Sequence, residues 1–341
     1  MKIAVIGGGL FGCTSAIHLA RAGCEVDLFE KNRHVMSGVS GSSYYRLHRG
    51  YHYPRSPETG MEGLAAEASF RAEYWPAVID TGEQYYAIAD TSKVSAHAFR
   101  EHCYNLDLMW WEHEPSEHVK GCEALFRVSE PRIDPEVLRT CVKTKLNQSG
   151  VNVHLETTAP QKGFRDRYNR IVLATYDRLN LGVAALGLEP EDYKYQVVER
   201  PMVRMPRGFG ETGIVVIDGE FCCIDPLGRS DLHIVGHVTE TVHDTLTGVT
   251  PLCLTEYPSK WKRIRDACTH YIPAIAQAQY VGSTFTVRSV LAGVEETDRR
   301  PTLVEQLDAQ VIRVFSGKLG TAVAAARQVV ELSTSQKTQA A

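Results

Sequence analysis

Residues 39–60, which read VSGSSYYRLHRGYHYPRSPETG, gather many of the side chains in this chain that can do chemistry, namely two histidines, three arginines and four tyrosines. An imidazole can act as acid, base or hydrogen-bond donor near neutral pH. The spacing of His48 and His52 would suit a metal pair on a helix. Pro54 opposes a regular helix there, however, and Arg49 would repel a cation. We therefore predict no metal, and we interpret the two histidines either as catalytic groups or as side chains satisfied by the backbone.

A glycine motif lies upstream of this stretch. Residues 2–6 are a short apolar run typical of a buried strand, and GGGLFG follows them. In this GxGxxG pattern Gly7 makes a tight turn, Gly9 lets the backbone approach a pyrophosphate, and Gly12 lets helix and strand pack closely. The helix expected over residues 10–22 then presents free N–H groups to the pyrophosphate. Glycine turns also serve packing alone, so the neighbouring elements decide between the two readings.

Those neighbouring elements favour a dinucleotide. Residues 24–31 alternate into a second strand that ends at Glu30, whose carboxylate is placed to bind a ribose and disfavours a 2′-phosphate. Residues 33–60 are long and polar with no clear strand, which suits a cofactor extended beyond its pyrophosphate. The sequence has no CxxxxC disulfide motif. These features predict FAD, reduced by the enzyme's own substrate.

The elements at the two ends of the chain have similar signatures. We expect a helix over residues 133–150, strands over 151–158 and 170–175, a strand over 311–316 and a helix over 317–333. Strand–helix patterns at both termini imply that the first and last segments share one sheet.

The middle of the chain alternates polar and apolar residues between Gly, Pro and Asp turns, which is typical of antiparallel strands. We therefore predict an α/β protein (α+β overall) with a Rossmann-like FAD-binding domain built on a parallel sheet and a substrate domain with a mostly antiparallel sheet. The predicted FAD-binding domain comprises residues 1–80, 131–190 and 291–335, the substrate domain 81–130 and 191–290, and the tail 336–341.

Composition narrows the class of protein. The chain has 341 residues, 43% of them hydrophobic and 23% charged, with a net charge of −4. That balance gives no strong nucleic-acid signal, and no run of about 18 apolar residues predicts a membrane span. Nine scattered cysteines without a CxxC pair predict reduced thiols in a cytoplasmic protein. The oligomeric state stays open.

In this order the motifs resemble the D-amino-acid oxidase superfamily of FAD enzymes, which includes glycine oxidase and monomeric sarcosine oxidase. The resemblance covers most of the chain through IAVIGGGLFGCTSAIHLARAG with Glu30, SGSSYYRLHRGY, RIDPEVLRTCVKTKLNQSGVNV, RIVLAT, RRPTL and VIRVFSGKLGTAV. The combination of the N-terminal motif with a C-terminal strand, SGxxG turn and helix is its most specific part.

The resemblance implies positions for the cofactor. The Ser- and Gly-rich turn before RLHRGY would lie along the flavin, with Arg49 over its ring and Arg46 and His48 as neighbours. The implied cofactor-binding residues are Gly7, Gly9, Leu10, Phe11, Gly12, Glu30, Lys31, Ser42, Ser43, Arg46, Leu47, Val153, Ala174, Thr175, Gly317, Lys318, Leu319, Gly320 and Thr321.

Lys318 also has a physical rationale. Hydride reduction leaves an anionic flavin, which a lysine at the edge of the ring would stabilise. The alternative is that Lys318 is a solvent-exposed lysine of a loop and has no role in the reaction. We predict Arg49, Lys318, His48 and His52 as the catalytic residues.

The residues expected to bind the substrate differ from those usual in the family. Amino-acid-oxidising members often carry an arginine just after the glycine that corresponds to Gly293, whereas this chain has Glu295 and Glu296 nearby. Glutamate repels a substrate carboxylate, so binding one would need another arginine, from Arg288, Arg299 or Arg300. We predict Tyr51, Tyr53, Arg288 and Glu295 as substrate residues. No cysteine lies near Glu295 or Lys318 in the sequence, so we expect noncovalent FAD.

The predicted function is FAD-dependent oxidation of the C–N bond of an amine or amino acid, free or carried on a larger molecule, by hydride transfer to flavin. The imine would then hydrolyse, with O₂ as one candidate electron acceptor. The alternatives are a redox-neutral mutase acting on a nucleotide sugar, a flavin monooxygenase, and a non-catalytic nucleotide-binding protein.

Overall fold

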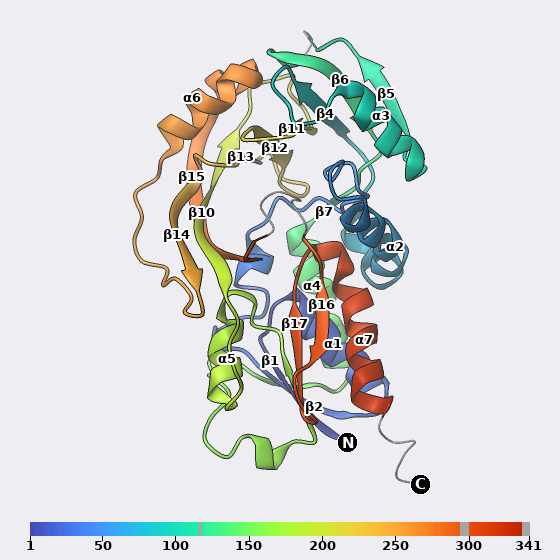
Figure 1. Ribbon diagram of the computed structural model, residues 1–341, viewed down its shortest axis with the longest axis vertical. Helices are drawn as coiled ribbons and strands as arrows, with labels where there is room; N and C mark the ends of the chain where they lie inside the picture. Colours follow the sequence, from blue (N-terminus) through green and yellow to red (C-terminus); the bar gives the residue numbers. More distant parts are fainter. Residues whose placement is uncertain (116–117, 294–299, 336–341) are drawn as a thin grey trace.

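The computed structural model describes residues 1–115, 118–293 and 300–335, and two large sheets organise it (Figure 1). The lower part of the view holds a six-stranded sheet and the N-terminus, while strands of a nine-stranded sheet fill the upper part. This mixed α/β architecture confirms the predicted fold class.

The six-stranded sheet has the order β16-β17-β9-β1-β2-β8. All neighbours in it are parallel except β16 and β17. Its strands are β1 (Lys2–Ile6), β2 (Glu25–Phe29), β8 (Asn152–His154), β9 (Arg170–Leu173), β16 (Leu303–Gln306) and β17 (Val311–Phe315).

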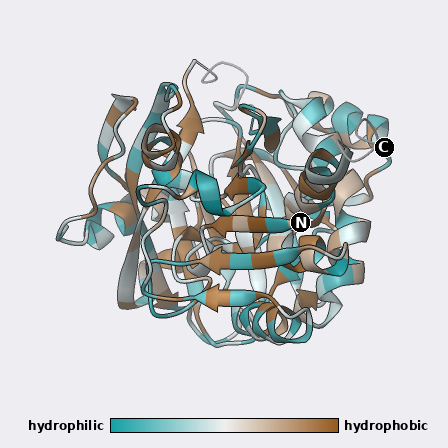
Figure 2. Ribbon diagram, turned by 90° about the horizontal axis from the view of Figure 1, so that it is seen from below, coloured by the Kyte–Doolittle hydropathy of each residue, from teal (hydrophilic) through white to brown (hydrophobic). Residues whose placement is uncertain are grey.

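Both faces of this sheet are buried, as expected for parallel strands. Ile3 and Val5 of β1 belong to one hydrophobic cluster with the helices on one face, whereas Ala4 and Ile6 belong to a second cluster on the other. Figure 2 shows these strands as mostly hydrophobic. The covering helices are α1 (Leu10–Arg21), α4 (Pro135–Gln148) and α7 (Ala322–Thr334) on the first face, and α5 (Leu179–Ala185) on the second.

The nine-stranded sheet has the order β14-β10-β13-β12-β11-β4-β6-β5, and β15 pairs with β10 beside that path. Its pairs are antiparallel apart from β11 with β4, which confirms the predicted mostly antiparallel sheet. The strands are β4 (Glu83–Ala89), β5 (Trp110–His113), β6 (Cys122–Val128), β10 (Tyr193–Arg204), β11 (Thr212–Ile217), β12 (Cys222–Pro226), β13 (His233–His237), β14 (Val242–Gly248) and β15 (Gln279–Leu291).

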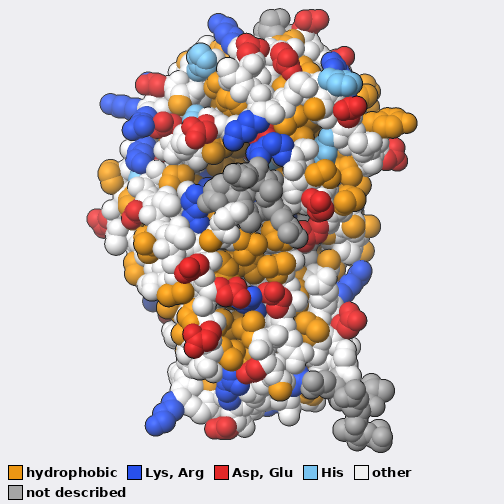
Figure 3. All heavy atoms as spheres, in the orientation of Figure 1, with side chains coloured by type: hydrophobic (Ala, Val, Ile, Leu, Met, Phe, Trp, Pro, Cys, Tyr) orange, Lys and Arg blue, Asp and Glu red, His pale blue; other side chains and the backbone are white. Residues whose placement is uncertain are grey.

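The remaining elements join or flank the two sheets. They are α2 (Pro57–Tyr74), α3 (Ala96–Asn105), α6 (Trp261–Tyr271) and the small ladder of β3 (Val78–Ile79) with β7 (Arg132–Ile133). On the face shown in Figure 3, acidic and basic side chains are interspersed. None of the described helices is both long and apolar enough to cross a bilayer.

Element boundaries differ from expectation at two helices. The helix expected over residues 133–150 begins at Pro135, because the Asp134 side chain caps it by accepting from the backbone N–H groups of Glu136 and Val137. The helix expected from residue 317 begins at Ala322 and follows a 3₁₀ turn, Leu319–Thr321. Lys318 itself is extended, with φ −114° and ψ 146°. The domain boundaries given above stay a prediction.

Candidate cofactor and substrate site

A large cavity, with a volume of about 1680 Å³, is lined by residues of both sheets. Its wall includes the glycine turn after β1, residues 37–46, the β10 and β15 strands, and the turn before α7. Pockets for one small ligand usually measure about 300–1,000 Å³. The volume therefore suits a dinucleotide together with a substrate.

The glycine turn has the geometry that its sequence predicts. Gly7 has a φ of 109°, and a Cβ added to it would lie 2.4 Å from the Ala174 carbonyl oxygen. A Cβ on Gly12 would lie 1.9 Å from the Gly7 carbonyl oxygen, so this glycine permits close packing. At the start of α1, the Leu10 N–H donates to Ser40 Oγ at 3.0 Å.

Glu30 lies at the end of β2 in the cavity wall, where the residue is 8% exposed. It accepts hydrogen bonds from the Gly8 backbone N–H at 2.7 Å and from the Asn32 backbone N–H at 2.8 Å. Each carboxylate oxygen can accept more than one bond, so the group retains capacity for ribose hydroxyls.

Most of the residues predicted to hold the cofactor line this cavity. Those in its wall are Gly7, Gly9, Leu10, Phe11, Glu30, Lys31, Ser42, Ser43, Arg46, Ala174, Thr175, Gly317, Lys318 and Leu319. Those outside its wall are Gly12, Leu47, Val153, Gly320 and Thr321.

The predicted cofactor residues that lie outside the cavity wall are held by packing and hydrogen bonding. A Cβ on Gly320 would lie 2.8 Å from Leu47 Cδ1, so these two residues are packed closely. Val153 packs against the core of the first sheet, and Thr321 Oγ1 lies 2.6 Å from Thr302 Oγ1. These positions support the cavity wall through packing, and their contact with the cofactor stays a prediction.

Lys318 lies in the wall with two histidines and a tyrosine. Its Nζ is 4.4 Å from the centroid of the Tyr53 ring, and the rings of His52 and Tyr53 are 5.1 Å apart. No described carboxylate pairs with Lys318. Burial, with the nearby positive charge of Arg46, lowers the pKa of Lys318 to about 7.

The histidines are neutral for the same reasons. Burial, together with the charges of Lys318 and Arg46, holds the pKa of both His48 and His52 well below the ordinary value. The Nδ1 atom of His52 and the hydroxyl of Tyr53 are buried with no hydrogen-bond partner among the described residues. His48 Nδ1 lies 3.4 Å from Glu130 Oε1. The cluster therefore offers buried polar atoms that are free to contact a ligand.

Arg46 joins this cluster to a buried acidic group. Its Nε lies 3.1 Å from Asp225 Oδ1, and its Nη1 donates to the Tyr86 hydroxyl at 3.3 Å. Tyr86 in turn donates to Glu130 Oε2 at 2.8 Å. Burial raises the pKa of Asp225 to about 6, although Arg46 opposes that shift.

Two predicted residues face away from the cavity. Arg49 forms a two-pronged ion pair with Glu67 of α2 and is absent from the cavity wall, whereas Arg46 lines it. The catalytic role expected for Arg49 stays a prediction. Tyr51 is fully buried and donates to the Met109 carbonyl oxygen at 2.7 Å, so it packs the second sheet and does not line a substrate site. Tyr53 and Arg288 do line the cavity. Glu295 lies outside the described residues.

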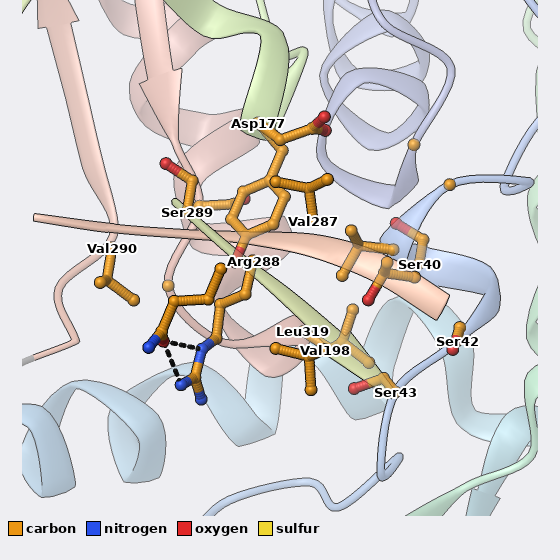
Figure 4. Close-up of a pocket in the computed structure, with 18 of the residues that line it drawn as sticks. Ser40, Ser42, Ser43, Asp177, Val198, Val287, Arg288, Ser289, Val290 and Leu319 are labelled. Carbon is orange, nitrogen blue, oxygen red and sulfur yellow. Dashed lines mark hydrogen bonds between the residues drawn. The ribbon is translucent and has the colours of Figure 1, made fainter. Parts of the chain in front are cut away.

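The β10 and β15 strands supply the opposite wall. Alternate residues of β10 from Lys194 to Arg200 line the cavity, as do Thr284, Thr286 and Arg288 of β15. Arg288 donates to Gln196 Oε1, its partner in the strand register (Figure 4).

Three features of the cavity wall were not predicted from the sequence, namely Arg200, Tyr44 and the ion pair of Arg55 with Asp218. Alternation along YKYQVVERPMVR was the signal that could have found Arg200. Tyr176 has a φ of 51°, and it also lines the cavity.

The described residues fit FAD. The glycine cradle, the Glu30 carboxylate and a cavity of sufficient volume are continuous with the buried polar cluster at Lys318. Thr175 Oγ1 lines the same cavity and is buried without a partner. Within the described ranges, no cluster of three or more His, Cys, Asp or Glu residues is arranged to hold a metal ion.

Comparisons with known proteins agree with this site. The model of a family described as FAD dependent oxidoreductase (DAO) matches residues 2–306. The FAD-dependent monooxygenase kojA of Aspergillus flavus is 28% identical over 383 aligned positions, which cover 97% of this chain and 85% of that protein.

Solved structures share the fold. Glycine oxidase from Geobacillus kaustophilus matches with a TM-score of 0.76 at 15% identity, covering 97% of this chain and 94% of that one. Iminodiacetate oxidase from a Chelativorans species matches with a TM-score of 0.75 at 12% identity, covering 97% and 95%. At such identities the likeness establishes the fold alone.

Proposed function

The chain belongs to the DAO family of FAD-dependent oxidoreductases, and from this premise we propose that it oxidises the C–N bond of an amine or amino acid, free or carried on a larger molecule. The observation that carries the proposal is the buried cluster of Lys318, Tyr53, His48 and His52 in the same cavity as the dinucleotide turn. Bound FAD supplies the hydride acceptor.

We infer which residues hold the cofactor from the cavity wall. The N-terminus of α1, with Gly7 and Gly9, suits the diphosphate because the positive end of the helix dipole lies there. Glu30 suits the ribose, and the turn from Ser42 to Ser43 suits the chain that leads to the ring.

Noncovalent binding is supported by the chemistry of the cysteines in the wall. Burial raises the pKa of the Cys223 thiol, while a hydrogen bond with Cys268 and burial raise that of Cys222. A protonated thiol is a poor nucleophile. Neither side chain is therefore suited to form a covalent link to the cofactor.

The charges near Lys318 favour a neutral amine. An amine can give up hydride only when its nitrogen carries a lone pair, and nearby positive charge lowers the pKa of an ammonium group. Lys318 and Arg46 supply that charge. The ammonium therefore loses its proton to solvent more readily, and His52, which has an unpartnered Nδ1, is able to accept a hydrogen bond from the neutral amine.

After hydride loss the same residues hold the product. Lys318 in its charged form stabilises negative charge that develops beside it. Enclosure of the cluster between the two sheets orients the amine, so positioning contributes more than a strong base. The imine then hydrolyses.

A second candidate is a monooxygenase, because the Aspergillus flavus relative named as one aligns with 97% of this chain. Oxygen-18 separates the two functions. With ¹⁸O₂ and an amine, an oxidase gives a carbonyl product whose oxygen comes from water, together with labelled peroxide. Incorporation of ¹⁸O into the organic product would overturn C–N oxidation in favour of the second candidate.

A further inference from the structure

The amine of Lys318 lies beside a group of three rings in the cavity wall. Its Nζ is 4.4 Å from the centroid of the Tyr53 ring, and the rings of His52 and His48 lie 5.1 Å and 5.9 Å from that tyrosine ring. All four residues line the cavity, and Figure 4 shows the next residue, Leu319, among side chains of the same cavity. The nitrogen therefore lies where a ligand in the cavity can reach it.

The charge state of this amine differs from that of an exposed lysine. Burial, together with the positive charge of Arg46, lowers the pKa of Lys318 to about 7, so close to half of the amine is neutral at pH 7. For an exposed lysine with a pKa of about 10.4, roughly one amine in 2,500 is neutral at that pH. Only the neutral amine has a lone pair that can attack carbon, and a lysine desolvated beside another cation is an activated nucleophile.

The cavity also provides a hydrogen-bond donor for such a reaction. The Tyr53 hydroxyl is buried with no partner among the described residues, and it belongs to the ring that Nζ contacts. It is therefore available to donate to a carbonyl oxygen bound near the lysine. The proposed function makes a carbonyl compound in this cavity, because hydrolysis of the imine leaves an aldehyde or a ketone. A neutral amine and a carbonyl product thus occupy the same enclosed space.

We propose that Lys318 forms a reversible Schiff base with an aldehyde or ketone bound in the cavity. The inference rests on the proposed function for the source of the carbonyl compound, and it gives the lysine a covalent role after the amine has been oxidised. The Nζ lone pair bonds to the carbonyl carbon, the carbon–oxygen bond breaks, and the oxygen leaves as water with the two protons of the neutral Nζ. Nothing is oxidised or reduced in this step, and water reverses it to release the carbonyl compound.

The test traps the Schiff base in the FAD-loaded protein. Propionaldehyde is added at pH 7 with cyanoborohydride, which reduces the C=N bond to a stable secondary amine, and the modified peptides are quantified by mass spectrometry. We expect Lys318 to be alkylated at least tenfold faster than Lys93, an exposed lysine in the wall of the same cavity. Lys318→Arg keeps a cation but should lose the rapid phase of alkylation, whereas Lys262→Met, at an exposed position of α6, should retain it.

Alkylation of Lys318 no faster than that of Lys93 would overturn the inference, as would the absence of any adduct on Lys318. A rapid phase that persists in Lys318→Arg would also overturn it, by assigning the reactive amine to another residue. If the arginine variant fails to fold, the peptide map of the wild type decides alone. The aldehyde is supplied from outside, so an adduct on Lys318 without flavin reduction by any amine would refute the proposed function and leave the Schiff base standing.

Discussion

Lys318 shows how its surroundings change the chemistry of one residue. It is enclosed beside Tyr53 with no carboxylate among the described residues to neutralise it, and Arg46 adds positive charge nearby. Both effects disfavour the ammonium form, so the pKa falls from 10.5 to about 7. The protein therefore holds a group at this site that changes charge near neutral pH and that can respond to a developing anion.

Replacing Lys318 with methionine should stabilise the FAD-free protein and impair its reaction. Because the folded pKa is lower than the unfolded one, the unfolded chain binds more protons between about pH 7 and 10.5, and the free energy of unfolding rises with pH there, by up to about 1.4 kcal/mol per pH unit. In Lys318→Met that rise should flatten, the free energy of unfolding at pH 7 should increase, and flavin reduction should slow at least tenfold.

Urea unfolding at pH 7, 8 and 9 measures the first effect, and anaerobic stopped-flow measures the second. Lys262→Met, at an exposed position of α6, is the control and should leave both unchanged. An identical pH slope in wild type and Lys318→Met would contradict the account of this lysine.

Arg46 and Arg49 should respond differently to truncation. Arg46→Ala leaves the carboxylate of Asp225, which is 0% exposed, without its partner, a change that costs about 3–5 kcal/mol. Arg49→Ala should cost about 1 kcal/mol, because that pair is partly exposed and Arg71 still binds Glu67. Urea unfolding gives both values. We also expect flavin reduction in Arg49→Ala to stay within about threefold of wild type, and a tenfold loss would restore Arg49 to the catalytic site.

At the residue scale, the sequence could not predict which of these arginines faces the cavity. The segment that carries them has no strand or helix between the 3₁₀ turn Val39–Gly41 and α2. Without a repeating period, no side-chain direction follows from position. The cluster of chemical groups was therefore predictable, whereas the members that face the cavity were not.

At the scale of elements, the strand, glycine turn and α1 form a unit that local sequence determines. A Cβ on Gly12 would meet the Gly7 carbonyl oxygen at 1.9 Å, and backbone on both sides prevents relief. We expect Gly12→Ala to lose FAD and to unfold at a lower temperature. Gly282→Ala, where an added Cβ meets nothing within 4 Å, should retain FAD; equal retention by both variants would refute the packing role.

In the cavity wall formed by β10 and β15, by contrast, local sequence does not determine which residues lie side by side. Alternation within each strand is visible in the sequence, but the register that sets Gln196 opposite Arg288 joins residues far apart in the chain. Turns of unequal length between the strands leave that register undetermined from one sequence. This explains why Arg288 was predicted as a substrate residue without its neighbour Arg200.

At the scale of the whole molecule, the cavity is shared by two sheets that also pack together in one hydrophobic cluster. A ligand that fills it should stabilise both, by about 2.7 kcal/mol at a free concentration one hundred times its Kd. We expect added FAD to raise the midpoint of thermal unfolding of the FAD-free protein in one cooperative transition. A midpoint that does not respond to FAD would show that the cavity is not its site.

The central claim is that an amine reduces the flavin of this protein directly. FAD-loaded protein is mixed without oxygen with a panel of neutral, cationic and anionic amines, and the visible flavin absorbance and released ammonia are recorded. We expect at least one amine to bleach the flavin, with one ammonia formed per flavin from a primary amine, or one smaller amine from an N-substituted substrate. If no amine bleaches it, or if turnover of a substrate requires flavin that has already been reduced, the account is contradicted.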